Sequence, residues 1–154
     1  IRYPRGTAYR GLKEFSQPIA YGKGEMLYEE SGIALLAVGS MVSTGEHVRD
    51  KLKAEGYACS LANGRFVKPF DRELVDRLAS NHRLIVTMEE NVLQGGYGLG
   101  VTAYVHAHYP QVKVLNIALP DAYVEHGNVS LLREALKIDS DSIIRTMKEG
   151  GWIG

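Results

Sequence analysis

The sequence predicts an α/β fold of three layers (α/β/α), in which a mostly parallel five-stranded sheet with one antiparallel edge strand lies between helices. Two observations lead to this prediction. Strand-length apolar runs alternate with helix-length segments along the chain, an order that is typical of parallel strands joined by crossover helices. The runs are also continuous rather than alternating, as in "IALLAVGS" at residues 33–40, which indicates strands buried on both faces.

The first elements follow from local patterns. In residues 18–32, "PIAYGKGEMLYEESG", apolar and polar residues alternate irregularly and glycines interrupt the pattern, which predicts a hairpin or an edge strand. This segment supplies the antiparallel strand of the prediction. After the buried strand that follows it, Val48 and Leu52 lie four residues apart, as on one face of a helix, and Ser43 or Thr44 is the expected cap.

The remaining elements repeat the same alternation, and three of the helices have a polar residue that suits the N-cap position. They are a strand at 57–63, a helix capped by Asp71, a strand at 84–91, a glycine-rich loop, a helix at about 99–108, a strand at 112–121, and two helices capped by Asn128 and Asp139.

Composition limits the classes of function. The chain has 154 residues, of which 45% are hydrophobic and 23% are charged, and this profile suits one compact soluble domain. Lys plus Arg equals Asp plus Glu at 18 each, so no overall charge attracts nucleic acid or an anionic membrane. No apolar run approaches the length of a membrane span, and no leader peptide is expected. Cys59 is the single cysteine and is expected to be a buried apolar residue, consistent with a reducing compartment.

One motif suggests a dinucleotide site. Gly98, Gly100 and Ala103 match G-x-G-x-x-A before a helix, and Asp121 ends the next strand, where an acid could bind a ribose. However, the predicted loop of residues 89–98 is longer than the tight turn that directs a helix N-terminus at a pyrophosphate. We therefore favour the alternative, in which these glycines let the helix pack closely on the sheet.

Other polar residues follow the predicted strands. Glu89 and Glu90 could hold Mg²⁺ or share a proton, but neighbouring residues of a strand point to opposite faces, so we expect no metal site. His126 and Asp121 share a strand-end loop and could move protons, although no nucleophile accompanies them. Single candidates are Lys68, which could meet a phosphate or only water, and His82, His106 and His108, which are expected to be solvated on helix surfaces or ends.

Arg5 lies in "YPRG", where Pro4 favours an extended Tyr3. The arginine side chain can donate two parallel hydrogen bonds to a phosphate or a carboxylate. The alternative is a solvated arginine in a linker.

Several segments together resemble the C-terminal domain of the 1-deoxy-D-xylulose-5-phosphate synthase family, from residue 1 to about residue 148. A wider resemblance includes transketolase and the β subunits of 2-oxo-acid dehydrogenases, which stay alternative assignments. The segments that carry the resemblance are "YPRG", "GKGE", "RFVKPFD", "VTMEENVLQGGYG" and "LNIALPDAYVEHG".

The resemblance implies a three-domain enzyme that uses thiamine diphosphate and Mg²⁺ to join pyruvate to glyceraldehyde 3-phosphate with loss of CO₂. Its product feeds isoprenoid, thiamine and pyridoxal synthesis. The cofactor residues belong to the first two domains, so this chain alone is expected to bind no cofactor and to be inactive. The one residue that carries over is Arg5, which would contact the phosphate of glyceraldehyde 3-phosphate.

The resemblance also divides the chain. Residues 1–10 would be the end of the preceding, pyrimidine-binding domain with its linker, and residues 11–154 the transketolase C-terminal-like domain. A first residue other than Met then fits a piece of a longer polypeptide. The partners implied are the missing N-terminal and middle domains and a second copy in a homodimer. The expected location is the bacterial cytoplasm, or a plastid if the source is a plant.

Overall fold

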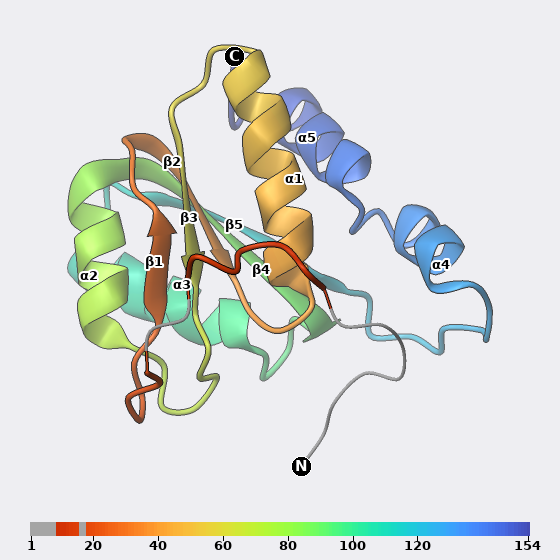
Figure 1. Cartoon of the computed structure of the whole chain (residues 1–154), viewed down its shortest axis with the longest axis horizontal. Coiled ribbons are helices and arrows are strands. Elements are labelled where there is room, and N and C mark those ends of the chain that lie inside the picture. Colours follow the sequence, from red (N-terminus) through yellow and green to blue (C-terminus); the bar gives the residue numbers. More distant parts are fainter. Residues whose placement is uncertain (1–8, 16–17) are drawn as a thin grey trace.

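A five-stranded sheet forms the middle of the molecule in the computed structural model, which describes residues 9–15 and 18–154 (Figure 1). Helices cover both faces of the sheet. The elements are β1 (Glu25–Tyr28), β2 (Gly32–Ala37), α1 (Met41–Ala54), β3 (Cys59–Asn63), α2 (Arg72–Asn81), β4 (His82–Val92), α3 (Tyr97–His108), β5 (Lys113–Leu119), α4 (Val129–Ala135) and α5 (Ser140–Glu149).

The strand order is β1-β3-β2-β4-β5. β2 pairs in parallel with both β3 and β4, and β4 pairs in parallel with β5, whereas β1 pairs antiparallel with β3 at one edge. The predicted fold class is therefore confirmed. The irregular segment before the first buried strand supplies the antiparallel edge strand, as its pattern predicted.

Side chains that alternate along the strands build two cores. On β2, Ile33 and Leu35 pack with α1 and α5, whereas Ala34 and Leu36 pack with α2 and α3. These residues are at most 1% exposed, as expected for a strand that is covered on both faces. Each helix contributes an apolar stripe to its core: Val48 and Leu52 from α1, Ile143 and Met147 from α5, Leu74 and Leu78 from α2, and Val101 and Val105 from α3.

The two ends of the sheet have different surroundings. We call the end at which β2, β3, β4 and β5 finish the carboxyl edge, and the end at which they begin the amino edge. Because β1 is antiparallel, its first residue, Glu25, lies opposite Asn63, the last residue of β3. The loop that precedes β1 therefore also lies at the carboxyl edge.

The predicted caps are mostly correct. Asp71 accepts a hydrogen bond from the amide of Leu74, and Asn128 and Asp139 cap α4 and α5 in the same way. The helix of α1 was predicted correctly but its cap was not, because the helix begins at Met41 with Ser40 as its N-cap residue. Ser43 lies inside the first turn, where its hydroxyl donates to the Ser40 carbonyl at 2.9 Å.

Candidate functional site

Glu89 is buried near the end of β4 and binds the start of α3. Its carboxylate accepts hydrogen bonds from the amides of Tyr97 at 2.9 Å and of Gly98 at 2.8 Å. The residue is only 2% exposed. Because the first amides of a helix point outward and carry a partial positive charge, a carboxylate there is stabilising. Glu89 is therefore the resident anion of the α3 N-terminus.

The glycines around Glu89 explain the motif before α3. A Cβ atom on Gly98 would lie 2.6 Å from both Asn116 Oδ1 and Thr87 Oγ1, and one on Gly96 would lie 2.7 Å from both carboxylate oxygens of Glu89. Gly98 therefore lets the helix approach the sheet closely. The two amides that a pyrophosphate would need are bound to Glu89 instead, an arrangement that favours the packing interpretation over a dinucleotide site.

The preceding loop is also shorter than expected. β4 continues to Val92, which pairs with Leu119 of β5, so only residues 93–96 join β4 to α3. The predicted loop of residues 89–98 is thus mainly the end of the strand and the first turn of the helix.

Glu90 points the other way, as alternation along a strand requires. It accepts hydrogen bonds from the hydroxyl of Ser40, at the start of α1, and from Arg133 Nε of α4 at 2.7 Å. Glu89 and Glu90 therefore do not form a carboxylate pair. In the described part of the chain, no group of three or more His, Cys, Asp or Glu side chains has the geometry of a metal site.

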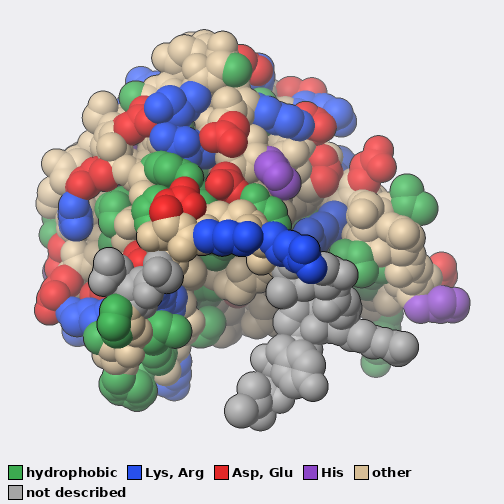
Figure 2. Space-filling model, viewed as in Figure 1, with side chains coloured by type: hydrophobic (Ala, Val, Ile, Leu, Met, Phe, Trp, Pro, Cys, Tyr) green, Lys and Arg blue, Asp and Glu red, His purple; other side chains and the backbone are tan. Residues whose placement is uncertain are grey.

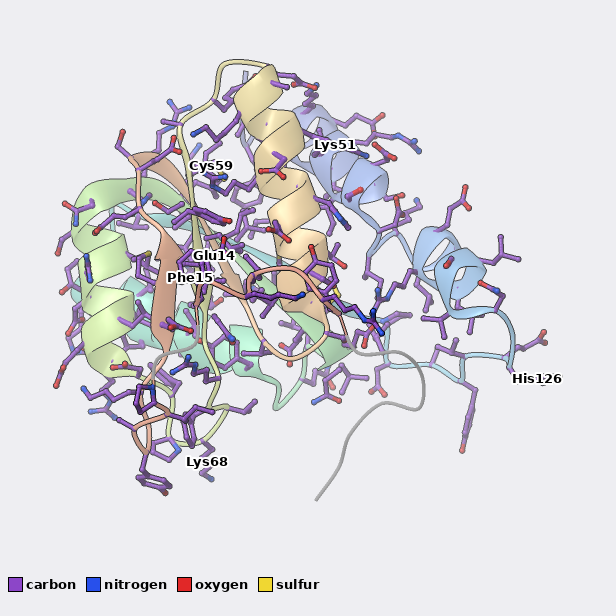
Figure 3. The ribbon with its side chains drawn as sticks, in the orientation of Figure 1. Glu14, Phe15, Lys51, Cys59, Lys68 and His126 are labelled. Carbon is purple, nitrogen blue, oxygen red and sulfur yellow. The ribbon has the colours of Figure 1, made fainter. Side chains whose placement is uncertain are left out.

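Asp121 and His126 lie in an extended segment after β5, in which every residue from 120 to 131 is exposed. We call residues 120–131 the arm. His126 stands at the outer end of the arm, and Lys68 is exposed on another loop far from it (Figure 3). The structure brings neither residue into contact with Glu89. Arg5, the principal candidate, lies outside the described residues.

Residues 9–15 are held against α1 and β1. The Tyr9 hydroxyl donates to Glu46 of α1, and this bond is the main reason that the pKa of Tyr9 is raised to about 12. The Tyr28 hydroxyl donates to Glu14 at 3.2 Å, and the rings of Phe15 and Tyr28 meet edge to face at 5.2 Å. The chain therefore enters the domain along the first half of α1.

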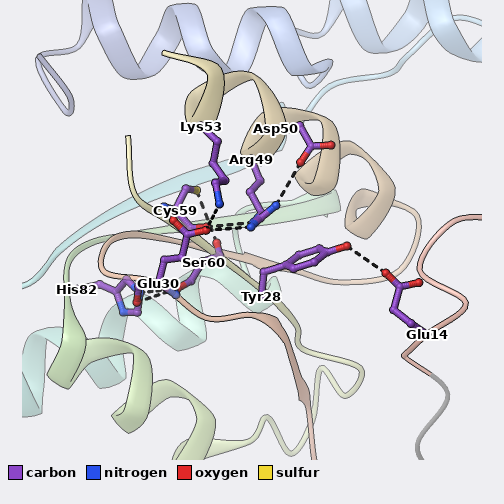
Figure 4. Close-up of polar contacts among 9 residues, drawn as sticks. All are labelled: Glu14, Tyr28, Glu30, Arg49, Asp50, Lys53, Cys59, Ser60 and His82. Carbon is purple, nitrogen blue, oxygen red and sulfur yellow. Dashed lines mark hydrogen bonds and ion pairs between the residues drawn. The ribbon is translucent and has the colours of Figure 1, made fainter. Parts of the chain in front are cut away.

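A polar cluster at the amino edge was not predicted from the sequence (Figure 4). The Glu30 carboxylate accepts hydrogen bonds from Lys53 and from Arg49 at 2.9 Å. The pKa of Glu30 is held below its usual value, mainly by the hydrogen bond from Lys53 and to a smaller extent by the charge of Arg49. Arg49 also lies over the ring of Tyr28, 3.9 Å from its centroid. The cluster joins the β1–β2 turn to α1 and has no solvent-facing nucleophile.

His82 corrects another prediction. It was expected to be solvated at a helix end, but it is the first residue of β4 and is only 5% exposed. Its Nδ1 lies 2.8 Å from the Leu78 carbonyl and its Nε2 lies 2.8 Å from Ser60 Oγ. His106 and His108 are exposed, as expected. Cys59 is buried as predicted, and burial raises the pKa of its thiol to about 12.

Comparisons with known proteins identify the chain's relatives. A family model described as transketolase, C-terminal domain, matches residues 22–143. The 1-deoxy-D-xylulose-5-phosphate synthase of Lachnoclostridium phytofermentans is 47% identical over 94% of this chain, and that of Heliobacterium modesticaldum is 39% identical over 97%. The chain spans about a quarter of the length of these relatives, 23% in both cases.

Solved structures agree with the fold. A split-gene transketolase, described as an inactive tetramer of four beta subunits, is 26% identical to this chain with a TM-score of 0.79. The match covers 85% of this chain and 43% of that one. The transketolase of Campylobacter jejuni, at 18% identity and a TM-score of 0.56 over 83% of this chain and 18% of that one, shares the fold. Within the described residues, no helix has the length and apolar character needed to cross a membrane.

Proposed function

This chain belongs to the transketolase C-terminal domain family, and from that premise we propose that it is the C-terminal domain of a 1-deoxy-D-xylulose-5-phosphate synthase. The observation that carries the proposal is the similarity to synthases along nearly the whole chain. The five segments that resemble the synthases occur in the family's order, from "YPRG" to "LNIALPDAYVEHG". The complete enzyme would join pyruvate to glyceraldehyde 3-phosphate with loss of CO₂.

In this proposal the cofactor, thiamine diphosphate with Mg²⁺, is held by the preceding domains of the complete enzyme. When bound, it would supply the carbanion chemistry of the reaction. The residues that the structure describes do not fit it. The helix N-terminus that could hold a diphosphate is bound to Glu89, and the described residues contain no metal-binding cluster. We accordingly propose that the 154-residue chain is inactive by itself.

Arg5 is the residue of this chain that we assign to substrate binding. The phosphate of glyceraldehyde 3-phosphate is a dianion with several acceptor oxygens, and an arginine can donate two hydrogen bonds to it. The order of the chain supports the assignment, because Arg5 precedes the segment that enters the domain along α1. The arginine would then belong to the junction between this domain and the one before it.

Kinetics of the full-length protein test this role. Replacing Arg5 with Ala removes a charge-assisted hydrogen bond worth about 1.5–3 kcal/mol. We expect kcat/KM for glyceraldehyde 3-phosphate to fall roughly 10- to 150-fold, and kcat/KM for pyruvate to change far less. Arg5→Lys should recover part of the loss, and Arg2→Ala is the matched control with a mild effect. Unchanged kinetics in Arg5→Ala would reduce Arg5 to a linker residue.

Calorimetry tests the division of labour between the domains. The 154-residue chain should show no stoichiometric, Mg²⁺-dependent binding of thiamine diphosphate, whereas the full-length protein should bind it. A tight complex with the short chain would overturn the assignment of the cofactor to the other domains. We also propose that the full-length enzyme is located in the cytoplasm and forms a homodimer. Light scattering of the purified protein would test the homodimer.

A further inference from the structure

The exposed apolar side chains of this domain are confined to one side of it. Within the described residues, all of the large apolar side chains that are exposed lie at or beyond the carboxyl edge, in three places: residues 9 and 99 near the starts of α1 and α3, the loops around β1 and β3, and the arm after β5. They are Tyr9, Ile19, Tyr21, Val67, Leu99, Tyr123, Val124, Val129 and Leu131.

One group lies on two neighbouring loops, residues 18–22 before β1 and residues 65–70 after β3, which we call the loop pair. Ile19 is 70% exposed and Tyr21 is 81% exposed. The ring of Tyr21 meets that of Phe66 edge to face at 5.6 Å, so the two loops support each other. These loops project from one corner of the molecule, and their apolar side chains are visible there (Figure 2).

A second group lies on the arm, at the opposite corner (Figures 1 and 2). Leu131 is 65% exposed, and α4 as a whole has no buried residue. A helix that buries nothing gains little from its own domain, because helices in proteins are stabilised mainly by packing of an apolar face. The ion pair of Arg133 with Glu90 holds α4, into which the arm leads, beside the carboxyl edge.

The amino edge is different in character. No large apolar side chain of the described residues is exposed there, and the surface carries paired charges instead. Arg77 Nε donates to Glu29 at 2.7 Å, and Lys148 lies 2.6 Å from Glu55. Satisfied charges facing water are typical of a free surface, whereas gathered apolar side chains mark a contact surface.

We propose that the carboxyl edge is the surface on which the preceding part of the same polypeptide packs, with the loop pair and the arm as its two apolar contacts. This inference rests on the proposed function, which gives the chain its preceding domains. The described chain begins on this side of the molecule, where Tyr9 is bonded to Glu46 of α1. The relatives extend over about four times the matched length, which provides a partner of sufficient size.

The same polypeptide is favoured over a second copy by its attachment. A domain joined through a short segment is present at an effective concentration in the millimolar range, well above that of a separate molecule. A weak affinity, with a dissociation constant below the millimolar range, is then enough for it to occupy the apolar loops next to the point of attachment. Contacts with a second copy are then an outcome for the experiment to detect.

Lysine cross-linking of the full-length protein tests the surface. Lys68 lies in the loop pair and Lys137 lies at the base of the arm, whereas the exposed Lys113 and Lys148 lie at the amino edge and serve as internal controls. We expect Lys68 and Lys137 to form cross-links to the preceding domains in several-fold higher yield than the controls. Equal yields from the two edges would overturn the proposal.

Isotopic labelling identifies the occupant. Light and heavy proteins are refolded together, and cross-links are assigned in the mixed dimers that native mass spectrometry isolates, or in the monomer if no dimer forms. Links within one isotopic form support the same polypeptide as the occupant. Links between light and heavy copies would overturn it in favour of a second copy. If the full-length gene product has no preceding domains, the proposed function itself is overturned. The kinetics of the Arg5 variants test the proposed function separately from these cross-links.

A pair of variants separates apolar contact from mere proximity. Val129→Ser with Leu131→Ser changes two exposed side chains of α4, so the core of the domain is not disturbed. We expect the cross-link yield of Lys137 to fall several-fold. The matched control, Arg83→Ser at the exposed amino edge, should leave it unchanged. An unchanged Lys137 yield in the arm variant would contradict a role for these side chains in the contact.

Discussion

Replacing Glu89 with Gln tests whether the buried carboxylate holds α3 on the sheet. The substitution keeps the volume of the side chain but removes its charge and replaces one acceptor oxygen with an NH₂ group. Either the amide of Tyr97 or that of Gly98 then loses its acceptor. Water cannot easily replace this acceptor, because Glu89 is only 2% exposed. Losing a charge-assisted hydrogen bond costs about 1.5–3 kcal/mol, and losing the anion at a helix N-terminus about 0.3–1 kcal/mol.

We therefore expect Glu89→Gln to lower the free energy of unfolding by about 2–4 kcal/mol, a large part of the 5–15 kcal/mol typical of domains. Glu90→Gln is the matched control, because it is the same chemical change at the next residue of the same strand. Its partners are the Ser40 hydroxyl and Arg133, and both side chains of the ion pair with Arg133 are partly exposed. Such a pair contributes about 0–1 kcal/mol.

Urea unfolding of the 154-residue chain, followed by circular dichroism, measures both variants. The midpoint should fall well below that of the wild type for Glu89→Gln and stay close to it for Glu90→Gln, with similar slopes for all three proteins. A loss in Glu89→Gln no greater than that in Glu90→Gln would refute the assignment of Glu89 as the anion of the α3 N-terminus.

Three further predictions use other features of the domain. Gly98→Ala should cost about 1–3 kcal/mol of stability in the same unfolding assay, because its Cβ would meet Asn116 at 2.6 Å. Gly100→Ala should be neutral or stabilising by up to about 1 kcal/mol, because its Cβ would meet only Phe70, at an ordinary contact distance of 3.9 Å. The thiol of Cys59, whose pKa burial raises to about 12, should resist alkylation at mildly alkaline pH until urea unfolds the chain, and rapid modification of the folded protein would contradict its burial. The Tyr9–Glu46 bond raises the pKa of Tyr9 to about 12. The stability that this bond contributes should be complete below the ordinary tyrosine pKa of about 10 and be lost as the pH rises through about 12. An ultraviolet titration should show the transition in the wild type and lack it in Tyr9→Phe.

The fold could be predicted because its signals are local. Continuous apolar runs identify strands covered on both faces, and a polar residue before an apolar stripe marks most of the helix starts. Where the prediction failed, a local signal was missing. No loop separates α2 from β4, since His82 is both the residue that ends the helix and the first residue of the strand. Without a turn signal between the two elements, the sequence placed His82 at the end of the helix rather than in the strand.

The role of Glu89 could not be predicted, because it depends on where a later helix begins. Its partners are eight and nine residues further along the chain, and they meet it only after β4 and α3 pack together. A signal was nevertheless present. Gly96 and Gly98 flank the helix start, and both are placed so that a side chain would collide with the surroundings of the carboxylate. Glycines spaced in this way mark close packing as readily as they mark a phosphate.

The contacts of His82 determine which of its ring nitrogens carries a hydrogen. The Leu78 carbonyl can only accept, so Nδ1 carries the hydrogen of the neutral ring, and Nε2 accepts from the hydroxyl of Ser60. The Ser60 oxygen in turn accepts from the Glu30 amide at 2.8 Å and lies 3.2 Å from the Glu30 carbonyl. One buried hydroxyl thus connects three separate segments of the chain, since Ser60 of β3 links the turn before β2 to His82, and His82 links it to the last turn of α2.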